Sequence, residues 1–203
     1  METKGERKMK SILISVKPKY CELIASGKKT IEVRKTKPKL ETPFKVYIYE
    51  TQGRYEDVRD CKTFKFWDIR QKVIGEFVCD KVFDIYEFSG SRFWLNETLV
   101  KATCLTEKEI NDYGKGKDIF GWHISDLVIY DKPRELSEFC TIDKEAVQNC
   151  KYRFQTYHQF TDTGYIKNGF ACDYNEDWCT KCKRKPITRP PQSWCYVESG
   201  DTE

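Results

Sequence analysis

The chain has no long hydrophobic run, and this absence restricts where it can act. The longest aliphatic stretch, Ile12 to Val16, is interrupted by Ser15, whereas a helix that crosses a bilayer needs about 20 apolar residues. The first ten residues are charged throughout and contain no apolar segment of the kind found in secretory signals. We therefore expect a soluble cytoplasmic protein that makes no use of a membrane.

Histidines are also few, and the sequence offers no glycine-rich loop long enough to bind a phosphate. The only two histidines, His123 and His158, do not adjoin a serine or cysteine in a recognisable nucleophile context, which disfavours a Ser/His/Asp or Cys/His hydrolase. The segment 114–117 (Gly-Lys-Gly-Lys) is too short for a phosphate-binding P-loop. It predicts a basic turn that is either simply solvated or in contact with a phosphate backbone.

Charge and aromatic residues are abundant and unevenly placed. Of the 203 residues, 33% are charged and 29 are aromatic, which indicates a folded globular protein rather than a disordered one. Residues 1–39 carry 12 Lys+Arg against 4 Asp+Glu, a net charge of +8, so the remaining 164 carry −4 of the overall +4. We interpret residues 1–8 as a solubilising tail. The basic residues from 17 to 39 predict a surface that faces a polyanion, with nucleic acid the leading candidate.

Ten cysteines without a secretory signal indicate a reducing compartment, where clustered cysteines favour a metal site. Cys179 and Cys182 form a CxxC pair whose thiolates can reach one zinc ion. Cys195 and Cys172 would complete a closed four-thiolate set, with Cys150 as the alternative fourth ligand. The prediction is a structural zinc that orders a segment poor in aliphatic residues.

Two other interpretations of this cysteine cluster remain open. Residues 178–182 resemble the redox Trp-Cys-x-x-Cys motif, but Pro186 leaves little room for the helix that such chemistry needs. The cysteines can also be reduced, buried thiols without a metal. The four earlier cysteines, which are scattered along the chain, are interpreted as small buried hydrophobic residues.

The residue pattern predicts many strands and few, short helices. Alternation and turn signals predict strands at 10–16, 30–34, 46–50, 73–88 (long or bulged) and 119–130, and helices at 18–27 and 106–114. No long helices separate successive strands, which favours a mainly β fold, a small closed or half-closed β-barrel with one or two helices against it. We predict a flexible basic tail over 1–9, the barrel domain over 10–139 and a cysteine-rich, zinc-stapled module over 140–203.

The stretch from Gly27 to Arg34 is the most informative part of the barrel domain. It follows the first helix and reads Gly-x-Lys-x-x-Glu-x-Arg, which places Glu32 and Arg34 on one face of a strand. Fixed charges at the mouth of a barrel are costly unless they are paired or used. The residues alone do not decide between a solvated ion pair and a functional cluster.

With the preceding strand and helix, this motif resembles that of the ASCH domain, a family of the PUA-like superfamily of RNA-associated β-barrels. The segment 120–127 and Pro133 resemble the last strand of the family, and the resemblance covers about residues 10–139. The whole chain is similar to ASCH proteins of phages and prophages, including a tail that ends with 189–197 (Arg-Pro-Pro-Gln-Ser-Trp-Cys-Tyr-Val).

The resemblance implies a cleft between the first helix and the barrel that binds RNA or a nucleotide-like ligand. Arg34 would clamp a phosphate or base edge, Lys29 would supply a point charge, and Glu32 would hold Arg34 or accept from an exocyclic amine. Lys17, Lys19 and Tyr20 would stand at the rim. Tyr20 or Trp122 would stack a base, although Trp122 is better explained as a core residue.

One branch of the family consists of amidohydrolases that remove acyl groups from modified cytidine, with a lysine, a threonine and a glutamate in the proposed active site. Lys29 matches the lysine, but Glu32 stands where that branch has threonine, and Thr30 lies one pleat earlier. If the chain is an enzyme, Lys29 and Glu32 would be the catalytic pair, with Glu107 as a second carboxylate. Binding without turnover is favoured; the alternatives are this hydrolase and a phage-encoded protein-interaction module.

Overall fold

A seven-stranded sheet occupies the centre of the molecule. The computed structural model describes residues 11–52, 71–89, 92–142, 157–160, 166–169 and 184–199. The strands, in their order across the sheet, are β13 (Arg184–Pro186), β10 (Phe139–Ile142), β14 (Trp194–Ser199), β1 (Ser11–Val16), β3 (Phe44–Glu50), β4 (Val73–Cys79) and β9 (Ser125–Arg134). Only β1 and β3 pair in parallel. β1 therefore lies between strands from opposite ends of the described chain.

A second, three-stranded sheet carries the charged motif. Its order is β2 (Ile31–Arg34), β8 (Phe120–His123) and β5 (Val82–Asp84), all antiparallel. The chain passes between the two sheets at residues 80–81, after β4, and at Ile124, between β8 and β9. Two hairpins lie outside these sheets: β6 (Tyr86–Ser89) with β7 (Arg92–Leu95), and β11 (Tyr157–Phe160) with β12 (Ile166–Gly169).

Three short α-helices and one 3-10 turn complete the described fold. They are α1 (Pro18–Ala25), α2 (Glu97–Thr103), α3 (Glu107–Gly114) and η3 (Leu136–Glu138). Asn96 caps α2, and Thr106 caps α3 in a reciprocal capping box with Glu109, which satisfies donors that the first turn leaves unpaired. In the part of the chain that the structure describes, no helix is long and apolar enough to cross a bilayer.

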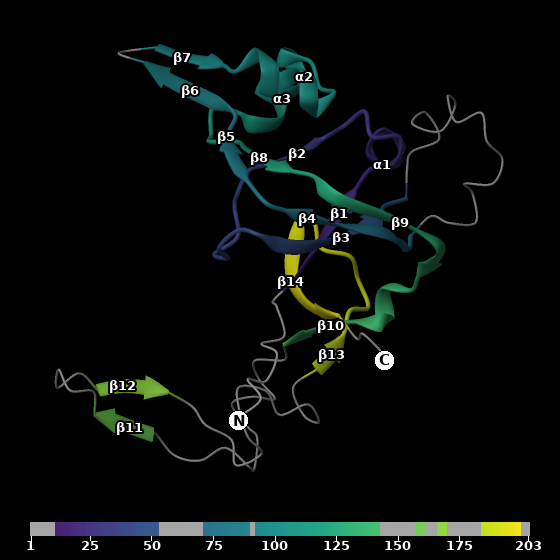
Figure 1. Cartoon of the computed structure of the whole chain (residues 1–203), viewed down its shortest axis with the longest axis vertical. Coiled ribbons are helices and arrows are strands. Elements are labelled where there is room, and N and C mark those ends of the chain that lie inside the picture. Colours follow the sequence, from purple (N-terminus) through teal and green to yellow (C-terminus); the bar gives the residue numbers. More distant parts are fainter. Residues whose placement is uncertain are drawn as a thin grey trace.

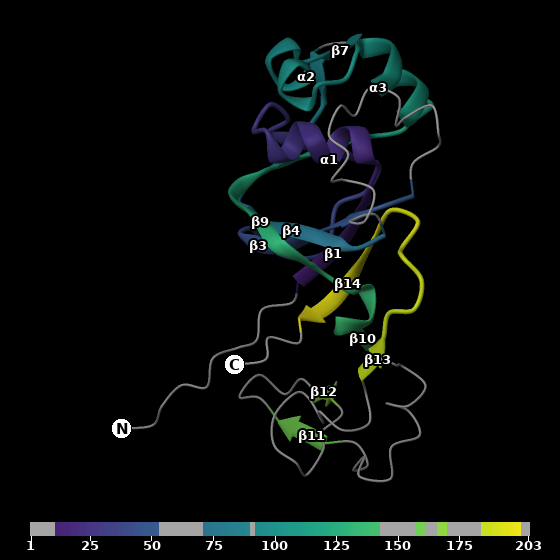
Figure 2. The same ribbon diagram turned by 90° about the vertical axis from the view of Figure 1, so that its right-hand side faces the viewer.

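Three apolar clusters hold these layers together. The first lies between the seven-stranded sheet, α1 and β8, and includes Ile14, Ile48 and Trp122. The second covers the opposite face of the seven-stranded sheet with Phe139 and Ile187, and the third joins β2 to α2 and α3. Figure 1 shows how the helices and strands are arranged, and Figure 2 shows α2 and α3 above α1, with the seven-stranded sheet below α1.

The mainly β prediction is confirmed, but of the predicted closed or half-closed β-barrel the closed form is wrong, because the sheets among the described residues are open. The strand predicted over 73–88 is three strands, since the chain changes sheet after Cys79 and turns again before Tyr86. The strand predicted over 119–130 also divides, at Ile124, which separates β8 from β9. Asp126 adopts a left-handed backbone conformation there, with φ of 46°.

The predicted boundary at residue 140 falls inside β10. Two further segments beyond it, β13 and β14, are strands of the same seven-stranded sheet, and β14 pairs directly with β1 from Ser11 to Ile14. The strands, the helix and the turn predicted at 10–34 are observed as β1, α1 and β2. The last strand of the described chain, β14, therefore lies beside its first strand, β1.

Candidate ligand-binding site

A cavity of about 530 Å³ opens between α1, β2, α3 and the turn before β14. Ligand pockets for small molecules commonly have volumes of about 300–1,000 Å³. All six residues predicted to bind a ligand line this cavity: Lys17, Lys19, Tyr20, Lys29, Glu32 and Arg34. Three charged or aromatic residues of α3 that the motif did not identify also line the cavity: Glu109, Asp112 and Tyr113. Gln192 adds a polar side chain from the turn before β14.

The local sequence explains how the chain turns from α1 into β2 and so places the motif at this cavity. Pro18 occupies the first turn of α1, where its missing N–H costs nothing. Gly27 follows the helix with φ of 70°, a conformation that residues with a Cβ adopt at a cost. The Lys29 N–H then donates to the Leu23 carbonyl oxygen. This turn reverses the chain into β2, so that Lys29, Glu32 and Arg34 enter beneath α1.

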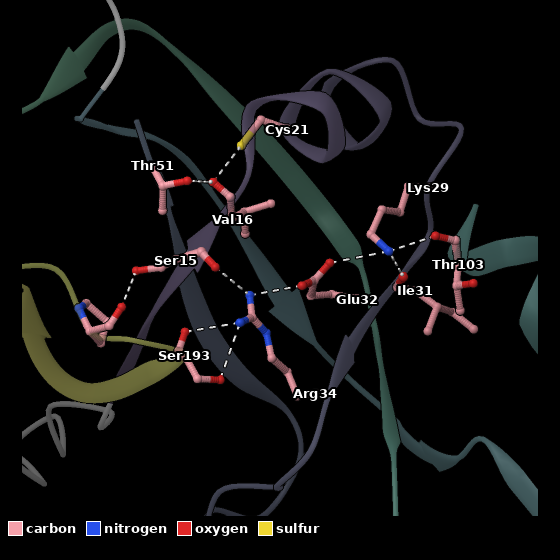
Figure 3. Close-up of polar contacts among 11 residues, drawn as sticks. Ser15, Val16, Cys21, Lys29, Ile31, Glu32, Arg34, Thr51, Thr103 and Ser193 are labelled. Atoms are coloured by element: carbon pink, nitrogen blue, oxygen red, sulfur yellow. Dashed lines mark hydrogen bonds and ion pairs between the residues drawn. The ribbon is translucent and has the colours of Figure 1, made fainter. Parts of the chain in front are cut away.

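Lys29, Glu32 and Arg34 form a buried ion cluster, with only 2%, 7% and 5% of their surfaces exposed. The carboxylate of Glu32 lies between the two cations, as Figure 3 shows. One oxygen is 2.9 Å from Arg34 Nη2, and the other is 3.4 Å from Lys29 Nζ. The ion pair predicted from the motif is therefore present, and it is buried rather than solvated.

The ammonium group of Lys29 is held in one position. Its Nζ donates to the backbone oxygens of Ile31 and Thr103, each at 2.8 Å, in addition to its contact with Glu32. Of the three donors of the ammonium, two are therefore used by backbone oxygens, and its charge is paired with Glu32. Nζ also lies 5.4 Å from the centre of the Tyr20 ring. Lys29 thus ties β2 to the end of α2 rather than presenting an uncommitted charge.

The guanidinium of Arg34 is oriented by acceptors from three segments. Nη2 donates to Glu32 and, at 3.0 Å, to the Ser15 carbonyl oxygen, while Nη1 donates to the Ser193 carbonyl oxygen at 3.2 Å. Figure 3 shows these bonds converging on Arg34 from β1, β2 and the turn before β14. Nε is buried and has no hydrogen-bond partner among the described residues. The Arg34 side chain, rather than backbone hydrogen bonds between strands, therefore links β2 to β1 and to the turn before β14.

The rim is more exposed and of mixed charge. Lys17 is exposed, and Lys19 is half-buried with Nζ 4.6 Å from the Tyr20 ring centre and 3.6 Å from Glu109. The pKa of Glu109 is lowered mainly by the backbone N–H of Thr106, which bonds to its carboxylate. Burial raises the pKa of Tyr113. The lining carries four cations (Lys17, Lys19, Lys29, Arg34) against three anions (Glu32, Glu109, Asp112), a net charge of +1.

Other predicted positions have different roles. Trp122 is fully buried and packs edge-on against Phe44, with ring centres 5.6 Å apart, which confirms its interpretation as a core residue. Glu107 is exposed in the first turn of α3 and does not line the cavity. The carboxylates that α3 brings to the cavity are instead those of Glu109 and Asp112.

Sequence reasoning missed the groups that hold the cluster in place. The acceptors from Ser15, Thr103 and Ser193 are backbone carbonyls, which no residue type marks in a sequence. Gln192 and Ser193 do lie within the segment 189–197, whose resemblance to phage ASCH tails was the available signal. That segment is the part of the chain where a search for further site residues would have succeeded.

Most of the predicted zinc ligands fall outside the described residues. These are Cys172, Cys179 and Cys182, together with the alternative ligand Cys150. Cys195 lies in β14 beside the second apolar cluster, and burial raises its pKa to about 11. Within the described ranges, no group of three or more His, Cys, Asp or Glu side chains is placed to hold a metal ion.

Comparison with known proteins places the chain in a family. No curated protein matches the sequence. The structure resembles the crystal structure of ASCH from Zymomonas mobilis, with 24% identity and a TM-score of 0.44 over 74% of this chain and 83% of that one. It also resembles a tyrosine-to-phenylalanine variant of the Zymomonas mobilis protein, with 24% identity and a TM-score of 0.43 over 73% of this chain and 85% of that one. The model of the ASCH domain family matches residues 14–164, about three quarters of the sequence, and the chain therefore belongs to the ASCH domain family.

Proposed function

We propose that this protein binds RNA or a nucleotide-like ligand in the cavity between α1, β2 and α3. The observation that carries the proposal is the convergence of all six motif and rim residues on one cavity, around a buried guanidinium that is already oriented. A pre-oriented group loses little freedom when a ligand binds. Membership of a PUA-like family associated with RNA supports the same ligand class.

The walls of the cavity suit the parts of a nucleotide. Tyr20 and Tyr113 supply aromatic faces on which a base can stack. Arg34 lines the cavity, where its guanidinium can donate to a phosphate or a base edge. Lys17 is exposed at the rim, where an ammonium can meet a phosphate. Because Glu32 is committed to Lys29 and Arg34, its role in this proposal is to position Arg34 rather than to contact the base.

The proposed activity is binding without turnover. A catalytic Lys29 would need a donor or lone pair available to the substrate, yet its ammonium already donates to two backbone oxygens and is paired with Glu32. The alternative, hydrolysis of an acylated nucleoside by Lys29 and Glu32, requires these contacts to open when substrate binds. Release of free cytidine from an N-acylated cytidine by the wild-type protein, and its loss in Lys29→Met, would establish that alternative.

Binding is best tested with mononucleotides and short single-stranded RNA. We would measure dissociation constants by calorimetry and fluorescence anisotropy for the wild type, for Arg34→Lys and for Tyr20→Leu. Arg34→Lys keeps the charge but removes the planar fork, so we expect binding to weaken about tenfold or more. Lys101→Ala, at an exposed lysine of α2, is the control and should bind like the wild type. Unchanged affinity in both cavity variants would exclude the cavity as the site.

We also propose a structural zinc ion held by Cys172, Cys179, Cys182 and Cys195, with Cys150 as the alternative fourth ligand. The support is the CxxC spacing of Cys179 and Cys182, with further cysteines on either side in the sequence. Thiolates are the ligands that closed zinc sites use. Metal analysis of the purified protein should give one zinc per chain, lost in Cys179→Ser and Cys182→Ser. Zinc retained in Cys195→Ser would reassign that ligand to Cys150.

A further inference from the structure

The three residues at alternate positions after Arg34 are lysines on the surface. Lys35, Lys37 and Lys39 are exposed, while Pro38 between them is buried and anchors the segment. The five residues from 35 to 39 extend over at most about 14 Å. Three positively charged residues therefore come directly after Arg34, whose buried guanidinium lines the cavity. The nearest carboxylate in the sequence is that of Glu41, two residues beyond Lys39.

Two of these lysines lie over aromatic rings. Lys35 Nζ is 4.7 Å from the ring centre of Tyr113, and Lys37 Nζ is 5.0 Å from that of Phe120. These distances are typical of cation–π contacts. Tyr113 also lines the cavity, so the row of lysines is continuous with the proposed site.

Aromatic residues of β14 form the other side of this surface. Trp194 Nε1 donates to Thr36 Oγ1 at 3.0 Å, and the Lys39 N–H donates to the Tyr196 hydroxyl at 2.8 Å. The Trp194 and Tyr196 rings pack edge to face, with centres 5.3 Å apart. Tyr196 is 37% exposed, which is unusual for a large aromatic side chain in the described part of the chain. The pairing of β14 with β1 thus brings two stacking surfaces to the lysines.

We propose that Lys35, Lys37, Lys39, Trp194 and Tyr196 form a strip that binds single-stranded RNA as it leaves the cavity. The inference rests on the proposed function. The cavity volume suits a ligand of about one nucleotide, so the rest of an RNA strand must lie on the surface. Proteins that bind single strands without sequence preference place cationic side chains along the phosphates and aromatic rings against the bases. The strip extends recognition from one nucleotide to a strand.

The strip and the cavity can be separated by the length of the ligand. We would compare the triple variant Lys35→Ala/Lys37→Ala/Lys39→Ala with a control that loses the same charge at exposed lysines elsewhere, Lys101→Ala/Lys132→Ala/Lys185→Ala. Each protein is titrated with ribonucleoside monophosphates and with a single-stranded RNA of about ten nucleotides across a salt series. Folding is checked by thermal unfolding.

The strip variant should bind monophosphates like the wild type but the longer RNA more weakly. Its log–log salt slope should be shallower by about 2, from three contacts at about 0.7 each. Tyr196→Leu should weaken the longer RNA about fivefold or more, whereas Tyr196→Phe, which keeps the ring, should not. The control triple variant should retain the wild-type slope.

The possible results separate the two proposals. A wild-type slope and affinity in the strip variant would overturn the strip and leave the cavity intact. Loss of binding in the strip variant, together with no effect of Arg34→Lys on either ligand, would keep the strip and overturn the cavity. A wild-type protein that binds neither ligand would overturn both.

Discussion

One basic segment has two halves that differ in burial: the inner half, residues 29–34, and the outer half, residues 35–39. From Lys29 to Arg34 the charges are buried, each takes part in an ion pair, and the two cations also donate to backbone oxygens. From Lys35 to Lys39 the charges are exposed, and Lys35 and Lys37 lie over aromatic rings. The residue types are similar, so the difference comes from burial alone.

This contrast shows what each kind of charge contributes. A buried ion must be compensated, because removing one partner leaves the other uncompensated in a low-dielectric interior. An exposed lysine is solvated by water and contributes little to stability. The inner charges therefore determine the shape of the site, and the outer ones remain available to a ligand.

The largest effect should come from neutralising the centre of the inner cluster. Glu32→Gln keeps the shape of the side chain but leaves Lys29 and Arg34 without their shared anion. We expect a loss of about 3–5 kcal/mol in the free energy of unfolding, measured with urea. The matched control is Glu109→Gln, which weakens the exposed pair with Lys19 and should cost no more than about 1 kcal/mol. Equal losses in the two variants would contradict the contrast.

A smaller effect is expected where α3 begins, at the other wall of the cavity. Thr106→Ala removes the hydroxyl that accepts the Glu109 N–H, and the loss of such a cap costs about 1 kcal/mol. The hydrogen bonds of this box hold the pKa of Glu109 below its ordinary 4.5. The stabilisation that the ionised Glu109 gives to the fold is therefore complete above pH 4.5, and it is lost as the pH falls through the lowered pKa. The Thr106 backbone N–H, which mainly lowers this pKa, remains in the variant, so a carboxyl titration by NMR should show the Glu109 pKa rising only part of the way towards 4.5. An unchanged pKa would show that the Thr106 hydroxyl does not contribute to the shift.

An ion pair outside both halves of the segment should have a smaller effect still. Asp80 accepts from His123 Nδ1 at 2.6 Å where β4 leaves its sheet, and this bond lowers the pKa of Asp80 below its ordinary 3.8. Because the pKa is lowered, the stabilisation is present above 3.8 and is lost as the pH falls through the folded value. Asp80→Asn should cost about 0.5 kcal/mol at pH 7. The cost should be smaller at pH 3 in the same urea experiment; an equal cost at both values would indicate a packing effect.

The smallest effect should come from the outer half itself. The triple variant at Lys35, Lys37 and Lys39 should unfold within about 0.5 kcal/mol of the wild type. It would then lose RNA binding without losing stability, the opposite of a change in the inner half that mainly destabilises the fold. A loss of several kcal/mol would mean that these lysines support the structure and are not simply available to a ligand.

Local signals predicted the elements that build the site. Alternation in 10–16, Pro18 at a helix start and Gly27 at a helix end act within a few residues, and β1, α1 and β2 follow them. The capping box that opens α3 is equally local and is observed. The helix α2 was missed although Asn96 caps it, because one capping residue next to a short segment is a weak signal. The division of 73–88 into three strands depends on contacts with β3, β8 and β9, which lie far away in the sequence.

The sequence by itself determined the residues that come together: the motif residues Lys29, Glu32 and Arg34 and the rim positions 17, 19 and 20 all line one cavity. Only the tertiary structure decided what holds them. The Thr103 oxygen that binds Lys29 is 74 residues away, and the Ser193 oxygen that binds Arg34 is 159 residues away. Every residue carries the same backbone carbonyl, so residue types cannot indicate which one will accept; the packing of α2 and the insertion of β14 beside β1 select these two.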